Sequence, residues 1–357
     1  MLYFYKSISP HPIENLHNYL HNFFSKMFDE VNPTYDHAHH IHADFKEIVT
    51  EYKAQIDDKL AAIFSSYIVL LPAEKQIVQT AYNNNNNIEG ICNKSVKPFK
   101  YDELPASIKT PIKSLYDQLW GDNKILGYKK VEDKCGKVKN HFDGFRKVNF
   151  HCVCPFCGLD SLLCEHDDGR DDYDHYLPKS EYPFIAVNFS NLFPMCHKCN
   201  SKSKGSVDTP FNNGNGEQQD LYFPYDYATV NHKVSLKINA PSTDLSNPES
   251  WSLQIDCEPT NIDKRASWVK VFNIEKRYKA IIAKESSTWM EMLRQQYRIL
   301  CIKGGVSFDM FLENITSSFD FYLDDNKGIL KKSFNAFILN DPHCEAKLSN
   351  QITIDNL

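Results

Sequence analysis

The chain has 357 residues, of which 42% are hydrophobic, 24% charged and 13% aromatic, and its net charge is −6. This aromatic content excludes wholesale disorder, and the length is enough for two or three domains of about 100–200 residues each. No apolar run approaches the roughly 18–20 residues of a membrane span, and the first residues lack the pattern of a signal peptide. We therefore expect a cytoplasmic protein that does not associate with membranes.

Residues 1–90 are predicted to be helical, because apolar residues recur there at steps of three and four. The helices predicted in this region cover residues 14–28, 43–70 and 73–82. Pro72 ends the second helix, and the run of five asparagines at 83–87 is interpreted as a loop. Residues 91–150 form a mixed, basic connecting region, with one further helix expected within 104–120.

Four histidines crowd together between the first two predicted helices: His37, His39, His40 and His42. A surface metal site and a histidine-rich loop are the two interpretations. Only Asp36 and Asp44 add carboxylates nearby, and no cysteine does. The loop is therefore the favoured interpretation.

A basic strip covers residues 124–147, where eight basic residues stand against three acidic ones. Its net charge is +5, which leaves −11 for the rest of the chain. A local strip of this kind can hold phosphates even on an acidic protein, and a solvated loop is the alternative interpretation.

Residues 216–357 are predicted to contain short strands and then helices. The strands are expected at 234–238 and 251–255, and the helices at 272–300 and within 308–339. The helical regions at both ends of the chain could clamp nucleic acid, form a homo-oligomer interface, dock a regulator, or simply cover apolar faces.

Cysteines mark the segment at 151–215. An odd total of eleven does not suit a disulfide framework, whereas two C-x-x-C knuckles supply the four thiolates of a structural zinc site. The 38 residues between the knuckles exceed what a plain zinc ribbon needs, and their polar character disfavours a redox motif. The predicted zinc ligands are Cys154, Cys157, Cys196 and Cys199, with Cys152, Cys164 and His166 as spare candidates.

The insert between the knuckles carries an ordered series of polar residues. Asp174-His175 is followed by Pro178, and Asn191 then leads into the second knuckle, which is followed directly by Asn200. A general base, an adjacent carboxylate and a neutral oxygen ligand are the parts of a metal-dependent phosphodiesterase. Four nearby acids are interpreted as a solvated loop and not as a second metal site: Asp167, Asp168, Asp171 and Asp172.

This order resembles the signature of the HNH endonuclease family, whose catalytic unit is a ββα-metal fold. His175 matches the first histidine and Asn191 the middle asparagine, while Asn200 stands where the name-giving residue is histidine. Asparagine is a known variant there, and its amide oxygen can ligate a hard cation. The resemblance covers about residues 152–205. It implies an α+β fold, with mostly helical N- and C-terminal regions around a central, zinc-stabilised, treble-clef-like ββα-metal module.

The resemblance also implies roles for individual residues. His175 would be the general base, Asp174 and Asn200 would hold a catalytic Mg²⁺ or Mn²⁺, and Asn191 would bond the backbone so that His175 stays aimed. Candidate phosphate contacts are Lys179, Lys202 and Lys204.

The residues around the motif narrow the resemblance further. Cys-Pro-Phe-Cys-Gly-Leu from 154 and Asp-His-Tyr-Leu-Pro-Lys-Ser from 174 look like HNH nucleases of bacterial anti-phage systems, of the Septu and retron-associated type. Members of that group often act with an ATPase that licenses cleavage. The expected function is therefore DNA cleavage in anti-phage defence, with nucleic acid and an ATPase as partners.

Two alternatives remain at this point. The same site could cleave RNA, such as tRNA, because hydrolysis by water does not require a 2′-OH. A catalytically inactive, zinc-stabilised binding or adaptor protein is disfavoured, since Asp174, His175 and Asn200 are all competent residues.

Overall fold

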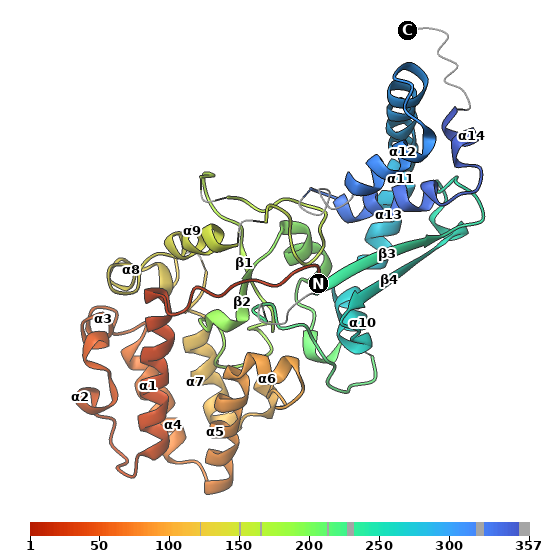
Figure 1. Ribbon diagram of the computed structural model, residues 1–357. Helices are drawn as coiled ribbons and strands as arrows, with labels where there is room; N and C mark the ends of the chain where they lie inside the picture. Colours follow the sequence, from red (N-terminus) through yellow and green to blue (C-terminus); the bar gives the residue numbers. More distant parts are fainter. Residues whose placement is uncertain are drawn as a thin grey trace. The chain divides into compact units, whose positions relative to one another are not determined.

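The computed structural model describes residues 1–121, 123–149, 151–164, 166–212, 214–226, 232–318 and 325–349. Contacts divide the chain into two compact units, coloured along the sequence in Figure 1. The first, here called the motif unit, comprises Phe4–Phe150 and Leu163–Ala228; the second, the hairpin unit, comprises Met1–Tyr3, His151–Leu162 and Thr229–Leu357. Among the described residues, no helix has both the length and the apolar character needed to span a bilayer.

The motif unit is mostly helical, with one short pair of strands. Its elements are α1 (Asn15–Asp29), α2 (His37–His40), α3 (Lys46–Glu51), α4 (Asp57–Ile68), α5 (Pro72–Asn86), α6 (Ile88–Cys92), α7 (Ala106–Tyr116), α8 (Lys129–Cys135), α9 (Val138–Val148), β1 (Tyr173–His175) and β2 (Leu192–Pro194). The predicted helices at 14–28 and 104–120 are confirmed by α1 and α7. The basic strip forms α8 and α9.

The predicted single helix over 43–70 is wrong, because the chain leaves helical geometry between α3 and α4. Tyr52 has φ −106° and ψ 48°, and Ile56 has φ −125° and ψ −66°. Ile56 is nevertheless fully buried, so the apolar spacing continues through a turn. Asp57 and Asp58 then begin α4, where acidic side chains are favourable at a helix N-terminus.

The asparagine run was predicted to be a loop, and this is also wrong, because α5 continues to Asn86. The side chain of Asn85 is fully buried and donates to the carbonyls of Phe99 (2.8 Å) and Pro183 (3.1 Å). Asn87 begins α6, its side chain accepting from the N–H of Gly90 at 2.9 Å. The amide of Asn85 thus bonds to other segments instead of competing for the backbone groups of its own helix, and that of Asn87 caps the next helix.

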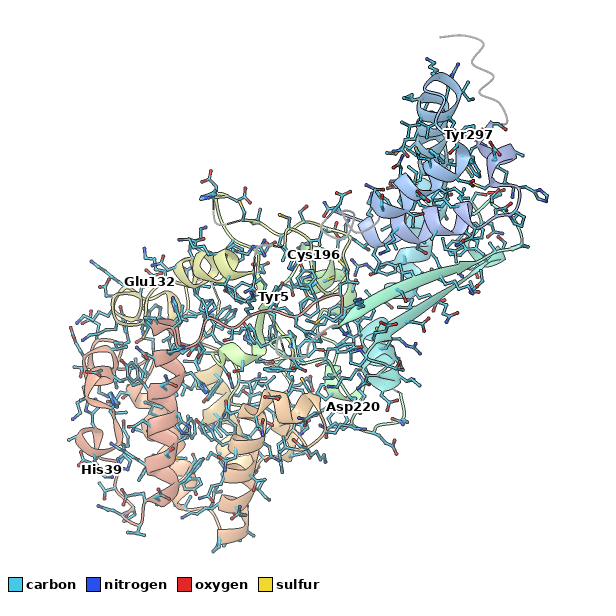
Figure 2. All side chains as sticks on the ribbon, viewed as in Figure 1. Tyr5, His39, Glu132, Cys196, Asp220 and Tyr297 are labelled. Atoms are coloured by element: carbon cyan, nitrogen blue, oxygen red, sulfur yellow. The ribbon has the colours of Figure 1, made fainter. Side chains whose placement is uncertain are left out.

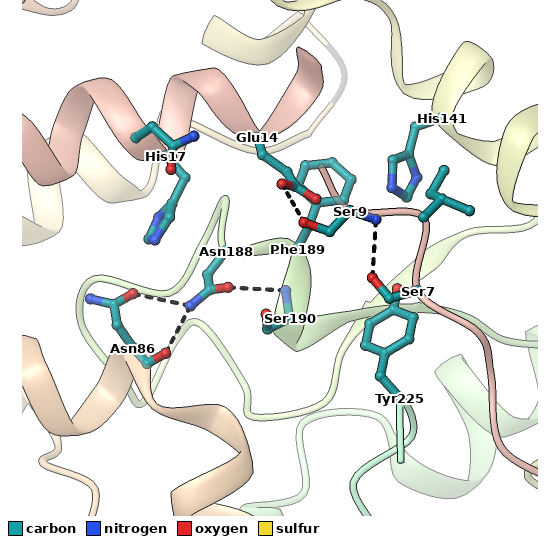
Figure 3. Close-up of a pocket in the computed structure, with 12 residues that line it drawn as sticks. Ser7, Ser9, Glu14, His17, Asn86, His141, Asn188, Phe189, Ser190 and Tyr225 are labelled. Atoms are coloured by element: carbon teal, nitrogen blue, oxygen red, sulfur yellow. Dashed lines mark hydrogen bonds between the residues drawn. The ribbon is translucent and has the colours of Figure 1, made fainter. Parts of the chain in front are cut away.

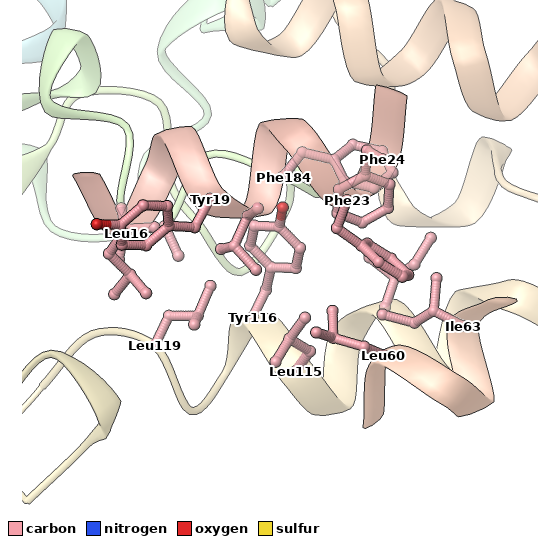
Figure 4. Close-up of a cluster of buried hydrophobic side chains, with 14 of the residues drawn as sticks. Leu16, Tyr19, Phe23, Phe24, Leu60, Ile63, Leu115, Tyr116, Leu119 and Phe184 are labelled. Carbon is pink, nitrogen blue, oxygen red and sulfur yellow. The ribbon is translucent and has the colours of Figure 1, made fainter. Parts of the chain in front are cut away.

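One aromatic side chain from the segment at 151–215, here called the motif segment, enters the hydrophobic core formed by the N-terminal helices. Figure 4 shows Phe184 beside residues of α1, α4 and α7. Its ring lies 5.3 Å from Phe24, 5.1 Å from Tyr82 and 5.7 Å from Tyr116, between centroids. Most of the motif segment and the N-terminal helices therefore share one hydrophobic core. The two compact units differ in this respect from the four segments predicted at 1–90, 91–150, 151–215 and 216–357.

The hairpin unit combines an antiparallel pair of long strands with helices (Figure 1). Strands β3 (Lys233–Asn239) and β4 (Ser252–Glu258) pair from Lys233↔Glu258 to Asn239↔Ser252. The helices are α10 (Ile262–Val271), α11 (Ile274–Tyr297), α12 (Phe308–Ser317), α13 (Gly328–Leu339) and α14 (Cys344–Ser349). Helix α13 packs on β3 and on α11. Both predicted strands and the long predicted helix are confirmed, and helices combined with small sheets are the content of an α+β fold.

Replacing the buried ring of Phe184 tests the shared core. We expect Phe184→Ala to lower the free energy of unfolding of the motif unit by about 3–5 kcal/mol, since it leaves a cavity among aromatic rings. Urea denaturation followed by circular dichroism measures the change. Val31→Ala is the control, because Val31 is 94% exposed and its loss should change stability by less than about 0.5 kcal/mol. Equal stability of the two variants would contradict a shared core.

Candidate functional site

The motif residues lie on two short strands and the helical turns after them. Strand β1 pairs antiparallel with β2, so that His175 faces Leu192 across the hairpin. A wide helical turn, Lys198–Lys204, follows β2 and carries Asn200. The chain order is thus strand, strand and helix, with Asp174 and His175 on the first strand.

Asn191 holds the loop that leaves β1. It is fully buried, and its amide makes two hydrogen bonds to one residue. The Leu177 N–H donates to Oδ1 at 2.8 Å, and Nδ2 donates to the Leu177 carbonyl at 3.0 Å. The backbone carbonyl of Asn191 also accepts from the N–H of Tyr176 at 2.9 Å. These are the side-chain-to-backbone bonds expected of this residue, and they fix the backbone directly after His175.

The imidazole of His175 has a defined orientation. Its Nε2 lies 2.9 Å from the carbonyl oxygen of Ala186, which can only accept, so Nε2 carries the proton and Nδ1 keeps its lone pair. The edge of the Trp120 ring packs against it at 5.4 Å between centroids. Burial lowers the pKa of His175 to about 3, although the Ala186 carbonyl opposes this shift. The imidazole is therefore neutral, which is the form that accepts a proton.

Asp174 is buried beside a lysine. Its Oδ2 lies 2.9 Å from the ammonium of Lys204, which also donates to the carbonyl of His175 at 2.8 Å. Burial raises the pKa of Asp174 to about 6, and Lys204 acts against that shift. Lys204 is itself buried, so in this structure its ammonium faces the site interior and not a phosphate at the surface. Lys202 is exposed and Lys179 half-buried, and their phosphate contacts stay predictions.

A cavity of about 570 Å³ opens next to these residues. Asn200 and Trp120 line it, together with three cationic side chains: Lys137, Lys139 and Arg170. The two lysines belong to the predicted basic strip, and each has a carboxylate neighbour, Lys137 with Glu132 at 3.7 Å and Lys139 with Asp143 at 2.5 Å. The strip thus contributes charge to one wall of the candidate site.

A smaller cavity of about 220 Å³, shown in Figure 3, lies where the motif segment meets α5. Nδ2 of Asn188 donates to the Asn86 side chain at 3.1 Å and to its carbonyl at 3.3 Å. Oδ1 of Asn188 accepts from the N–H of Ser190 at 3.0 Å. The turn before Asn191 is therefore fastened to the end of the asparagine run.

The four predicted zinc ligands come together, and Cys196 is labelled in Figure 2. The sulfur atoms of Cys154, Cys157, Cys196 and Cys199 lie within 4.8 Å of one another, and all four residues are buried. Four thiolates at about 2.3 Å from a central ion form the usual tetrahedral zinc site, so this donor set fits Zn²⁺. The spare candidates Cys152, Cys164 and His166 are not part of this group.

Glycine is needed at the first knuckle. The N–H of Gly158 donates to the Cys154 carbonyl at 2.7 Å, and Gly158 has φ +63°. A Cβ atom there would meet the side chain of Leu2 at 2.3 Å. The tight turn that places Cys154 and Cys157 side by side therefore excludes a larger residue.

Several residues that build the site carried no signal in the sequence argument. Ala186 contacts His175 through its backbone carbonyl, and Trp120 packs against His175 with the edge of its ring. Asn86 and Asn188 were not singled out, although an asparagine run beside a motif offers amides for such bonds.

Two curated proteins match parts of this chain. The Septu protein PtuB of Bacillus thuringiensis is 39% identical over 61 residues, which are 17% of this chain and 21% of PtuB. Protein ea31 of Escherichia phage lambda is 35% identical over 78 residues, which are 22% of this chain and 23% of ea31. The matches thus span less than a quarter of either relative. No family model and no solved structure matches the chain.

The Asn191 amide can be tested by truncation. Asn191→Ala leaves the buried N–H and carbonyl of Leu177 without partners, at about 1–3 kcal/mol each, so we expect a loss of at least about 2 kcal/mol in the free energy of unfolding. Ser190→Ala, which alters an exposed neighbour, should cost less than about 0.5 kcal/mol. Denaturation curves that coincide for the two variants would rule out this role.

The cysteine cluster predicts a spectroscopic signature. Protein reconstituted with Co²⁺ should show the thiolate-to-metal charge-transfer absorption of a four-sulfur site, and Cys196→Ser should weaken it clearly. Cys301→Ser, outside the cluster, should leave the spectrum unchanged. A spectrum that is insensitive to Cys196→Ser would show that the cysteines do not form the site.

Proposed function

We propose that this chain is a metal-dependent HNH endonuclease that hydrolyses phosphodiester bonds in DNA, as an effector of anti-phage defence. The observation that carries the proposal is the state of His175. One ring nitrogen is held by the Ala186 carbonyl, so the other is left as a base, beside the buried carboxylate of Asp174. An oriented neutral histidine next to a carboxylate suits the activation of water.

His175, Asn191 and Lys204 have different roles in the proposed reaction. Nδ1 of His175 takes a proton from the attacking water, while its Nε2–H stays hydrogen-bonded to the carbonyl of Ala186. Asn191 keeps the backbone after His175 in place through Leu177. Lys204 bonds the His175 carbonyl and pairs with Asp174, and so holds strand β1 against the helical turn that follows β2.

The donor set beside His175 fits a hard divalent cation. The buried carboxylate of Asp174 is paired through Oδ2 with the Lys204 ammonium at 2.9 Å, and Asn200, whose side-chain amide carries an oxygen, lines the cavity. Oxygen ligands of this kind are those that Mg²⁺ and Mn²⁺ prefer. When bound, the ion would stabilise negative charge on the scissile phosphate and the leaving oxygen.

The cavity supports a nucleic-acid substrate. Three cationic side chains, of Lys137, Lys139 and Arg170, outnumber the acidic Glu132 and Asp172 in the lining to which Asn200 belongs. Phosphate contacts dominate the affinity of nucleic-acid-binding proteins. DNA is the proposed substrate, and RNA is the alternative for the same site. Parallel digestion of duplex DNA, single-stranded DNA and tRNA distinguishes them.

The proposed place in anti-phage defence rests on the partial match to the Septu protein PtuB and on the residues around the motif. An ATPase that licenses cleavage is the partner we propose on the same basis, with homo-oligomer formation as a second proposal. Cleavage that requires the ATPase would identify the chain as the effector of a regulated pair.

The decisive experiment compares wild type with His175→Ala on supercoiled plasmid, single-stranded DNA and tRNA, with Mg²⁺ or Mn²⁺. We expect at least a hundredfold loss of cleavage in the variant, because general-base catalysis contributes about 10²–10⁴-fold. Cleavage should also stop when both cations are omitted. His343→Gln, an exposed histidine of the hairpin unit, is the matched control. Equal cleavage by wild type and His175→Ala would overturn the proposal.

A further inference from the structure

A second group of metal-ligating side chains lies in the motif unit, between the end of α1 and the end of α2. Glu30, His39 and His40 bring one carboxylate oxygen and two imidazole nitrogens within 4.8 Å of one another. Oε2 of Glu30 lies 3.4 Å from Nε2 of His39 and 3.3 Å from Nε2 of His40. Figure 2 labels His39 on α2.

The two oxygens of Glu30 have different surroundings. Oε1 accepts hydrogen bonds from the N–H groups of Val31 (3.0 Å) and Asn32 (2.7 Å). Oε2 is the atom that faces both histidines. The two backbone bonds to Oε1 anchor this carboxyl group and leave Oε2 turned toward the histidines.

His40 is oriented by its other nitrogen. Nδ1 lies 2.8 Å from the Asp36 carbonyl and 3.1 Å from the Asp36 N–H, and the shorter contact places the proton on Nδ1. Nε2 then carries a lone pair. The side chain is 1% exposed and Nε2 makes no hydrogen bond, although Oε2 of Glu30 lies 3.3 Å away. With the proton on Nδ1, Nε2 and the carboxylate oxygen of Glu30 are two acceptors that repel each other at this distance, and a cation bound between them removes the repulsion.

The distances suit such a cation. In a tetrahedral zinc site with ligands at about 2.0–2.1 Å, neighbouring ligand atoms are about 3.3–3.4 Å apart. Both distances from Oε2 of Glu30 agree with this value. A backbone carbonyl on the far nitrogen of a histidine is also the usual support of a metal ligand, and Asp36 supplies it for His40.

We propose that Glu30, His39 and His40 bind a divalent transition-metal ion, Zn²⁺ by ligand type. Two imidazoles and one carboxylate favour zinc over Mg²⁺ or Ca²⁺, which take mainly oxygen ligands. His39 is 56% exposed, so water completes the fourth position. This site is separate from the cysteine cluster and from the proposed catalytic cation.

The bound ion acts as a brace. It joins the residue after α1 to the far end of α2 and so closes the loop between them; because folding brings these ligands together, the binding free energy of the ion adds to the stability of the folded state. His40 already packs against Phe64 at 4.7 Å and stacks on Tyr35 at 5.4 Å, between centroids. The ammonium of Lys26 holds the carbonyl of His39 at 2.6 Å. The ligands are therefore placed before the ion arrives.

The test measures zinc per chain in untagged protein dialysed against a weak chelator. The double variant Glu30→Gln/His39→Asn removes two ligands and spares the buried His40. We expect wild type to hold one equivalent more than this variant, and zinc to raise the melting temperature of wild type only. His37→Asn, a histidine of the same helix outside the group, is the control and should match wild type.

Nitrogen-15 NMR of the histidine rings locates the ion independently of the cysteines. On addition of zinc to the apoprotein, Nε2 of His39 and of His40 should shift, and Nε2 of His37 should not. Equal zinc content in wild type and the double variant, or an equal loss in His37→Asn, would overturn the proposal. Unchanged Nε2 signals of His39 and His40 would do the same.

Discussion

The burial of the Phe184 ring among Phe24, Tyr82 and Tyr116 is the contact on which the geometry of the candidate site depends. Two residues further on, Ala186 presents the carbonyl that orients His175. Phe184 has φ +75°, a left-handed conformation that costs about 1–3 kcal/mol for a residue other than glycine. The chain tolerates this cost because the aromatic core fixes the ring. The helical core formed by the N-terminal residues thus sets the orientation of the His175 imidazole in a later segment.

Side-chain amides at the end of α5 also hold the segment between β1 and β2 in place. The buried Asn85 bonds the carbonyl of Pro183, directly before Phe184, and Asn86 bonds Asn188, three residues before Asn191. The insert between the two strands is therefore held by a ring and by two side-chain amides of one helix end. Because the buried amides of Asn85 and Asn188 would be costly without partners, these bonds specify one arrangement of the segment between β1 and β2 and disfavour others.

Sequence periodicity predicted α1, α7, α11 and the strands β3 and β4, because apolar residues recur in each of them at the regular spacing of a buried face. The cysteine spacing likewise anticipated the cluster of four thiolates. The features that the sequence did not predict depend on contacts between residues far apart in the chain. The asparagines became helical because their amides found partners far along the chain, and Lys204 looked like a surface lysine until folding buried it beside Asp174. Glu30 gave no signal, since only the reversal of the chain after α1 brings it to the histidines.

The shared core also has a consequence for the order of events during protein synthesis. Helices α1 to α7 leave the ribosome well before Phe184, so they can collapse while the core still lacks that ring. The contacts of Phe184 with Phe24, Tyr82 and Tyr116 join residues far apart in the sequence, and such contacts form late because they must overcome a large loop entropy. A nascent or truncated chain would therefore present the motif without an aimed histidine. The arrangement of Asp174, His175 and Asn191 seen here is therefore a property of the folded motif unit and not of the motif segment alone.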